Sequence, residues 1–451
     1  MDINELQGLQ QDAILHTMFM KTPKEDLKNL GAFILTKSDG VRVFDVNGRQ
    51  YIDAIASGGR ATLVGYGREK IAKALYDQAK TIHCHASHHT ITDTAIKLLK
   101  KLSEIAPGDL SLTTLLSGGS DANESAFKLA KQYHMHNGYP RRYKIISRRG
   151  AFHGTTLGAL SATGSMSPMR EVNAPLVPGF YFIPPPTCYR CPFGREYPNC
   201  ELECAIALEQ QIQFEDPQQV AAFIAEPIMQ FEGVYVPPQE YFPKIRSICD
   251  KYGVLLIDDE VITGFGRTGK WFACEHFNFI PDLMTLAKGI TSGYIPLGAV
   301  MLTNEIAGKL PVFMDIRTYA MHPVASAGAL TNIEIIEQEK LVDKASNNGA
   351  YLIEGLKNLE KHPMIGDVRG IGMWCAIEFV QDKRSKARFA AENNPADLVF
   401  KKAREQGILI GVVNQSVEVA PPLIIEKSDI DTIITVLDKS IGLTERELGV
   451  K

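Results

Sequence analysis

The strongest pattern along the chain is a series of apolar runs of four to seven residues, each ending in a polar or glycine-rich turn. Helical stretches follow these runs, which is typical of buried parallel strands in an α/β sheet. Each run places a polar residue after its strand, at the sheet edge where open α/β folds bind ligands. The clearest runs lie in residues 113–133, 143–154, 221–227 and 253–261.

The two ends of the chain have different patterns. Apolar and polar residues alternate in VRVFDVNGRQYIDAI, and Asn47-Gly48 is a two-residue turn signal, so residues 41–55 are predicted to form an antiparallel hairpin. From about residue 330 the pattern changes to longer helices with short strands such as WCAIEFV and GILIGVV. A domain boundary is therefore predicted near residue 330.

Composition and charge narrow the class of function. The 451 residues exceed the size of a disulfide scaffold, and 48 basic against 52 acidic residues give a net charge of -4. No basic surface indicates nucleic acid, and no stretch of eighteen apolar residues indicates a membrane span. The opening MDINELQGLQQDA lacks the pattern of a signal peptide. We expect a cytoplasmic protein with small-molecule partners, and neither nucleic acid nor membrane.

Three features carry candidate chemistry. Gly118, Gly119 and Ser120 leave a strand and enter a helix, where free amides and the helix dipole can bind phosphate. Asp259 ends an apolar strand, and Lys288 follows another apolar run. Each has an ordinary structural explanation when taken alone: a capped turn for the first two and a surface charge for the lysine.

Together the segments DEVITGFGRTGKWF and PDLMTLAKGITSGYIPLGA closely resemble the signature of class III pyridoxal-phosphate aminotransferases, the ω-transaminase group of fold type I. The resemblance extends from the hairpin near residue 41, through VGYGREKI, to APPLIIEKSDID. It implies an α/β fold with a large domain, residues 56–329, built on a mostly parallel sheet. A smaller α+β domain would come from both termini, residues 1–55 and 330–451.

The resemblance also implies a pyridoxal 5'-phosphate cofactor and roles for individual residues. Lys288 matches the lysine that binds the cofactor covalently and then moves a proton during the reaction. Asp259 matches the acid that pairs with the pyridine nitrogen and keeps the ring protonated. Lys288 and Asp259 are thus the implied catalytic residues, and no catalytic metal is implied.

Other implied cofactor contacts surround these two. Gly119 and Ser120 match the phosphate cup, and Gly118 stands where a serine is frequent. The further matches are Phe152, in place of the usual tyrosine over the ring, His153 after it, Glu226 near the cofactor, Val261 beneath the ring, and Thr318. Thr318 matches a threonine that reaches the phosphate of the neighbouring subunit, although AM replaces the common SG before His322-Pro323. A homodimer with active sites at the interface is therefore implied.

The implied activity moves an amino group from a primary amine or ω-amino acid to a keto acid, pyruvate or 2-oxoglutarate, in a ping-pong cycle. An amino-acid racemase or epimerase of the same family is an open alternative, because it would use the same lysine and aspartate. A more remote alternative is a cofactor-binding or metal-binding protein without turnover.

Substrate recognition departs from the usual pattern of the family. Many relatives place an arginine before the PPL strand to bind the keto-acid carboxylate, whereas LIGVVNQSVEVAPPL has Glu418 as its only charge. Arg60 stands where relatives often have tryptophan. We therefore hypothesise that Arg60 binds the substrate carboxylate or sulfonate; a structural pairing near the dimer interface is an equal alternative.

Cysteines and histidines form two further clusters. Cys188, Cys191, Cys200 and Cys204 have the spacing C-x2-C-x8-C-x3-C, which suits either a structural zinc site or simple packing. His83, His85, His88 and His89 are expected near the pocket mouth without a metal. The remaining cysteines, at positions 84, 249, 274 and 375, are expected in the core or the pocket lining.

Overall fold

A seven-stranded sheet forms the centre of the computed structural model, which describes residues 33–85, 90–165, 167–231 and 233–450. Its strand order is β4-β10-β9-β8-β7-β5-β6, and of these strands β10 alone runs antiparallel to its neighbours. The predicted mostly parallel sheet is confirmed. The bounds are β4 Leu110–Leu116, β5 Lys144–Arg148, β6 Phe180–Ile183, β7 Val220–Ala225, β8 Leu255–Asp259, β9 Leu283–Leu286 and β10 Gly298–Thr303.

Both faces of this sheet are covered, which explains why its inner strands are apolar without alternation. Helix α5 (Gly119–His136) packs on one face, where Ile224 and Ile257 point. Helices α8 (Glu203–Phe214) and α9 (Tyr241–Tyr252) cover the opposite face of the sheet, and Phe223 and Leu256 point toward them. Successive residues of β7 and β8 therefore enter two separate apolar cores.

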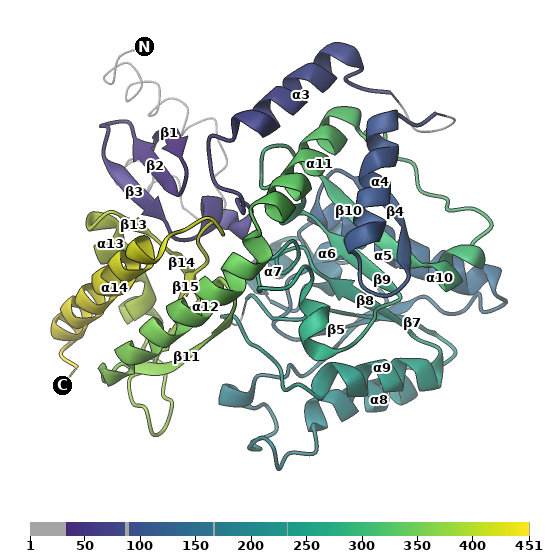
Figure 1. Cartoon of the computed structure of the whole chain (residues 1–451). Helices are drawn as coiled ribbons and strands as arrows, with labels where there is room; N and C mark the ends of the chain where they lie inside the picture. Colours follow the sequence, from purple (N-terminus) through teal and green to yellow (C-terminus); the bar gives the residue numbers. More distant parts are fainter. Residues whose placement is uncertain (1–32, 86–89, 166, 232, 451) are drawn as a thin grey trace.

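The smaller domain is built from both ends of the described chain. Its first sheet has the order β1-β2-β3-β13, in which β3 and β13 run parallel although they lie near opposite ends of the sequence (Figure 1). The second sheet has the order β11-β12-β15-β14. The bounds are β1 Leu35–Asp39, β2 Arg42–Asp45, β3 Gln50–Asp53, β11 Ile365–Ile371, β12 Trp374–Phe379, β13 Ile408–Leu409, β14 Gly411–Val413 and β15 Ser416–Val419.

The predicted hairpin is confirmed in β2 and β3, which pair antiparallel. The connection is longer than the two-residue turn expected, because Phe44 is the last residue of β2 that pairs with β3, and it lies opposite Gln50. Asp45 Oδ1 accepts hydrogen bonds from the backbone N–H of Asn47 and of Arg49, each at 2.9 Å, and Gly48 has φ +78°. The Asp45 carboxylate thus closes the turn. The preceding strand β1 was not predicted.

Helices α3 (Glu69–Thr81) and α4 (Asp93–Ile105) pack against α11 (Pro323–Gln338). Helix α11 runs across the boundary predicted near residue 330, so the division of the chain at that point stays a prediction. The remaining helices are α6 Leu157–Ala162, α7 Ser167–Val172, α10 Asn304–Gly308, α12 Leu341–Lys357, α13 Pro395–Glu405 and α14 Lys427–Leu448. The short turns are η1 Ala56–Arg60, η2 Cys188–Arg190, η3 Ala273–Phe277, η4 Lys288–Ile290, η5 Asn358–Lys361 and η6 Ala391–Asn393.

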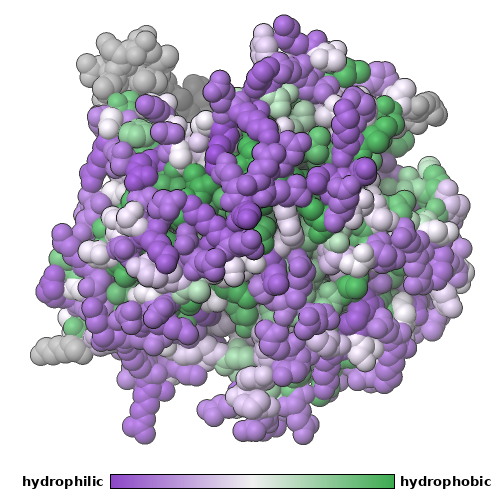
Figure 2. All heavy atoms as spheres, viewed as in Figure 1, coloured by the Kyte–Doolittle hydropathy of each residue, from purple (hydrophilic) through white to green (hydrophobic). Residues whose placement is uncertain are grey.

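The surface is mainly hydrophilic on the face shown in Figure 2, with hydrophobic side chains in smaller patches. Among the helices in the described ranges, none combines the length and apolar character needed to span a bilayer.

Candidate functional site

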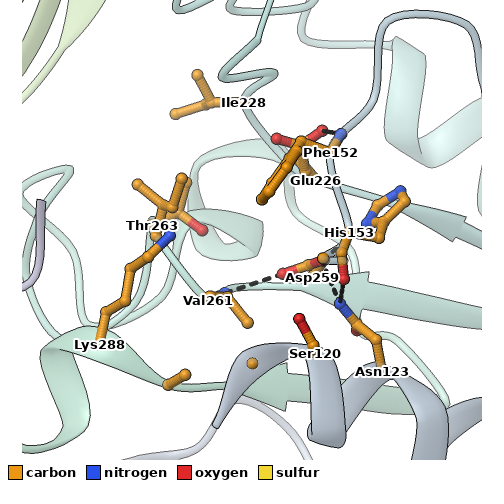
Figure 3. Close-up of a pocket in the computed structure, with 14 residues that line it drawn as sticks. Ser120, Asn123, Phe152, His153, Glu226, Ile228, Asp259, Val261, Thr263 and Lys288 are labelled. Carbon is orange, nitrogen blue, oxygen red and sulfur yellow. Dashed lines mark hydrogen bonds and ion pairs between the residues drawn. The ribbon is translucent and has the colours of Figure 1, made fainter. Parts of the chain in front are cut away.

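A cavity of about 170 Å³ opens at the carboxyl ends of the central strands. Its walls come from the start of α5 and from the segments that follow β5, β7, β8 and β9 (Figure 3). The structure brings together eight of the residues singled out in the sequence: Gly119, Ser120, Phe152, His153, Glu226, Asp259, Val261 and Lys288. Gly118, Thr318 and Arg60 do not line this cavity.

Asp259 is held in place by three hydrogen bonds. Its Oδ2 accepts from His153 Nδ1 at 2.7 Å and from Asn123 Nδ2 at 2.9 Å, and its Oδ1 accepts from the Val261 backbone N–H at 3.1 Å. The carboxylate is 4% exposed, so these bonds fix its direction in a site largely free of water. A carboxylate oriented this way can pair with a positively charged ring nitrogen.

Asn123 is the site residue that the sequence reasoning missed. Its amide also donates to the His153 backbone oxygen at 2.7 Å, so it ties Asp259 and His153 to helix α5. A signal was available: Asn123 follows Ser120 by three positions in a helix, and residues at this spacing share one face. Thr263 and Ile228 also line the cavity and carried no such signal.

Lys288 lies at the other side of the cavity from Asp259, with Val261 between them in Figure 3. Burial lowers the pKa of the Lys288 amine to about 8, and the charge of Arg60 adds to this effect, while Asp259, Glu226 and Glu418 oppose it. The lysine has φ +42°, a strained conformation for a residue with a side chain. A lysine with this pKa has a substantial share of free amine near neutral pH, which suits a nucleophile.

The start of α5 supplies a place for an anion. Gly119 is the first residue of the helix, and a Cβ added to it would lie 2.9 Å from Val261 Cγ1, so only glycine fits without movement. Gly154 approaches in the same way: a Cβ there would lie 2.3 Å from Ser120 Oγ. Close backbone approach, the Ser120 hydroxyl and the helix dipole together favour a phosphate group at this end of the cavity.

Glu226 joins the walls on the other side. Its two carboxylate oxygens accept hydrogen bonds from the backbone N–H of Phe152 and of Gln230, both at 3.1 Å. Burial raises the pKa of the Glu226 carboxyl above its usual value. The Phe152 ring is stacked on Phe231 with 6.3 Å between ring centroids, so its plane is supported from behind.

Comparison with protein families matches residues 24–441 to the description "Aminotransferase class-III". The chain belongs to the class III aminotransferases.

Individual relatives of this aminotransferase cover nearly its whole length. The taurine–pyruvate aminotransferase of Bilophila wadsworthia is 38% identical over 440 residues, 94% of this chain and 95% of that protein. A leucine/methionine racemase of Thermococcus litoralis is 35% identical, with 97% of each protein covered. The solved (S)-enantioselective ω-transaminase of Thermomicrobium roseum has a TM-score of 0.94 at 38% identity, covering 98% of this chain and 99% of that one. Fold type I and a transaminase activity are thereby confirmed.

Class III aminotransferases depend on pyridoxal phosphate, and the cavity of this member fits that group. Asp259 presents a fixed carboxylate, Lys288 an amine of lowered pKa, and the start of α5 a close backbone approach with the Ser120 hydroxyl. The His153 Nε2 atom is buried without a hydrogen-bond partner among the described residues. The space between Phe152 and Val261 in Figure 3 suits a flat ring.

Arg60 of the aminotransferase forms an ion pair with Glu418, beside the cofactor cavity. Arg60 Nε donates to Glu418 Oε2 at 2.8 Å, and its terminal NH2 group binds the same oxygen. Glu418 lies on β15 with no exposed surface, and Gln230 Nε2 donates to its other oxygen at 3.4 Å. Arg60 therefore has a structural ion-pair partner; whether it lies near a dimer interface and whether it also binds substrate stay predictions.

Thr318 is exposed, lies in a turn and does not line the cavity of its own chain. The neighbouring Arg317 anchors this turn, because it forms ion pairs with Asp121 and with Asp315, each at 2.6 Å. Asp121 lies in the first turn of α5, so the turn is fixed next to the predicted phosphate end of the site.

The cysteine cluster lies apart from this chemistry, and the position of the histidine cluster stays a prediction. The four clustered cysteines line a second cavity that shares no residue with the first. Of the other cysteines, Cys249, Cys274 and Cys375 are buried as expected. His83 and His85 are described, and the prediction for His88 and His89 lies outside the described residues.

Within the described ranges, one group of three potential metal ligands has its ligand atoms within 4.8 Å of one another: Asp258, Glu260 and Cys274. It is fully buried behind the site. Burial and the neighbouring charges of Glu260 and Asp259 raise the pKa of Asp258, and burial raises that of Glu260 to about 7. A proton held by this pair of acids explains their burial without a metal.

Proposed function

We propose that Lys288 and Asp259 are the catalytic pair of this aminotransferase. The observation that carries the proposal is their arrangement: an amine with a lowered pKa faces an anchored carboxylate across a single cavity. When bound, the cofactor supplies an electron sink for the negative charge that forms on the substrate carbon. The chain's own part is to bind it, orient it and move a proton.

Each residue has a distinct task in this proposal. Asp259, fixed by His153 and Asn123, keeps the ring nitrogen positively charged. Lys288 Nζ takes the proton from the substrate carbon and returns it at a different atom, which separates transamination from racemisation. Phe152 and Val261 hold the ring between them. Glu226 lies beside the ring as a buried acid that can form an ion pair with a cation of the substrate or of the protein.

The phosphate would be bound by Gly119 and Ser120, with backbone support from Gly118 and the hydroxyl of Thr318 of the partner subunit. A homodimer follows from this assignment. The segment that carries Thr318 supports it, because Met314, Ile316 and Tyr319 are 68%, 73% and 60% exposed, which is unusual for large apolar side chains of a lone subunit. Light scattering with size-exclusion chromatography should give twice the chain mass; a monomer that retains full activity would contradict this assignment.

The donor is proposed to be a primary amine or an ω-amino acid, and the acceptor pyruvate or 2-oxoglutarate. The taurine–pyruvate relative supports a donor with a distal acidic group. Arg60 is the proposed recognition residue for that group and for the keto-acid carboxylate. Because Glu418 already binds Arg60, an anionic substrate would have to draw the guanidinium away from it.

The test is a half-reaction. The visible absorbance of the purified holoenzyme is recorded while single donors are added without keto acid: taurine, β-alanine, 4-aminobutyrate, putrescine and α-amino acids. Loss of the absorbance in proportion to enzyme, reversed by pyruvate or 2-oxoglutarate, is the expected result. Lys288→Ala should show neither step. No response to any donor would contradict the proposal.

The racemase relative makes a second outcome worth measuring. A racemase would exchange the α-hydrogen of an amino acid with solvent deuterium and leave the cofactor absorbance unchanged at the end of the cycle. Exchange without net amino transfer would replace the first proposal by this one.

We further propose that the enzyme works in the cytoplasm. All eight cysteines are free thiols in the structure, which suits a reducing compartment.

A further inference from the structure

The four clustered cysteines converge on one small cavity far along the chain from Lys288. Cys188 lies in η2 and Cys191 follows it, while Cys200 precedes α8 and Cys204 lies in the first turn of that helix. All four line the same cavity, whose volume is about 20 Å³. A cavity of this size holds one water molecule or one ion and nothing larger.

The chemistry of the lining is that of a soft metal site. None of the four sulfur atoms takes part in a disulfide bond. The one cation among the lining residues, Arg195, already pairs with Glu203 at 3.0 Å. Thiolates at this place therefore need a cation from outside the chain.

The segment that carries the cysteines has little regular structure of its own. Between the end of β6 at Ile183 and the start of α8 at Glu203, the three-residue turn η2 is the only helix or strand that the structure shows. Ordered segments of this length without secondary structure are uncommon and usually have a functional or covalent reason. Four cysteines from its two ends are suited to close it into a loop.

This loop also connects the two domains. The Lys386 amine donates to the Tyr189 backbone oxygen at 2.8 Å, and Arg190 donates to the Lys386 backbone oxygen at 2.7 Å. Arg190 also forms an ion pair with Glu378 of β12. Tyr189 and Arg190 lie between Cys188 and Cys191. A ligand that holds these two cysteines in place would therefore also hold the hydrogen bonds and the ion pair that Tyr189 and Arg190 form with the smaller domain.

We propose that Cys188, Cys191, Cys200 and Cys204 together bind one Zn²⁺ ion as a structural site. Two closely spaced cysteine pairs are the usual arrangement of a four-thiolate zinc site. Each thiol releases its proton to solvent on binding, and no sulfur is oxidised or reduced. The ion neutralises the negative charge of the four thiolates, for which the lining residues offer no free cation. It also closes the loop that carries Tyr189 and Arg190.

Zinc binding requires a measurable movement. No three of these four sulfur atoms lie within 4.8 Å of one another, since the described residues hold one such group and it lies elsewhere. Zinc–sulfur bonds of about 2.3 Å would bring the sulfurs to about 3.8 Å apart. Bound metal should therefore draw the two cysteine pairs inward and shorten the loop.

The first test is metal analysis of the holoenzyme, expressed with zinc supplied and purified without chelators or metal-affinity resin. We expect about one zinc per chain, released when a mercurial reagent blocks thiols. The same protein reconstituted with Co²⁺ should show absorption bands in the red part of the visible spectrum, which are typical of tetrahedral thiolate coordination and lie at longer wavelengths than the absorption of the cofactor. Eight free thiols without metal and without Zn²⁺ uptake, a disulfide among the four, or iron instead of zinc would each overturn the proposal.

Variants locate the site. Replacing Cys188 and Cys191 together by serine should abolish zinc binding and lower the melting temperature, whereas Cys84→Ser, outside the cluster, should leave the metal content at one per chain. If the double variant does not fold, analysis of the wild-type protein decides alone. Equal zinc content in both variants would overturn the assignment. Zinc content is measured independently of transamination, so its failure leaves the proposed function untouched.

Discussion

Asp259 and His153 are joined by a hydrogen bond of 2.7 Å between Oδ2 and Nδ1, and both side chains are buried. A carboxylate can only accept, so the proton of this bond belongs to His153 Nδ1. Asn123 completes the arrangement through its bonds to Asp259 Oδ2 and to the His153 backbone oxygen. The direction of the carboxylate is thus set by helix α5 as well as by its own strand.

Asn123→Ala should slow the donor half-reaction by about 10- to 100-fold, because hydrogen bonds to charged groups contribute about 1.5–3 kcal/mol. The rate of absorbance loss at saturating donor measures it. Asn137→Ala, at the C-terminal end of the same helix, is the matched control and should leave that rate unchanged. An unaltered rate in Asn123→Ala would show that Asp259 needs no support from α5.

The lowered pKa of Lys288 predicts a pH dependence that can be followed in cofactor-free protein. Burial holds that pKa at about 8, so the free amine becomes dominant above pH 8 and its reductive methylation should rise through a midpoint near 8. Lys251 is the control, because its bond to Glu209 raises the pKa and it should react only at higher pH. Mass spectrometry of the two peptides reports both midpoints; a midpoint for Lys288 no lower than that of Lys251 would contradict the prediction.

The role of Arg60 can be separated from its pairing with Glu418. Arg60→Ala alone would leave a buried carboxylate without its partner, which by itself destabilises a protein. We therefore compare the double variant Arg60→Ala/Glu418→Gln with Glu418→Gln. The double variant should raise KM for the keto acid about tenfold relative to Glu418→Gln, with little change for a neutral amine donor. Equal changes for both substrates would assign Arg60 a purely structural role.

The buried acids Asp258 and Glu260 predict how stability changes with pH. Folding raises the pKa of Glu260 to about 7, above an unfolded value of about 4.3, so the folded protein keeps a proton that the unfolded chain loses. This proton makes its full contribution to the stability of the folded protein below about pH 4.3. The contribution is lost as the pH rises through about 7. The melting temperature should therefore fall between about pH 4.5 and pH 7 and level off above that. Asp258→Asn, which removes a second buried carboxyl with a raised pKa, should flatten this decline; an identical decline would contradict the explanation.

The sequence allowed the central sheet, the hairpin around Asn47-Gly48 and the cavity residues from Gly119 to Lys288 to be predicted, because each depends on local pattern or on a family motif. The length of the hairpin connection was not predicted. The pairing of Arg60 with Glu418 could not be predicted in this way. The two residues are 358 positions apart, and only the tertiary fold brings them together. Asn123 was missed for a different reason: its helical spacing from Ser120 was visible, but nothing in the spacing shows that its amide turns toward Asp259.

The parallel pairing of β3 with β13 has a consequence for how the enzyme is made. Strand β3 leaves the ribosome early, whereas β13 is synthesised near the end of the chain, and at about 5–20 residues per second the interval lasts tens of seconds. Throughout that time the edge of β3 has no native neighbour, although the large sheet can already assemble. The N-terminal hairpin therefore presents an unpaired strand edge until the end of synthesis.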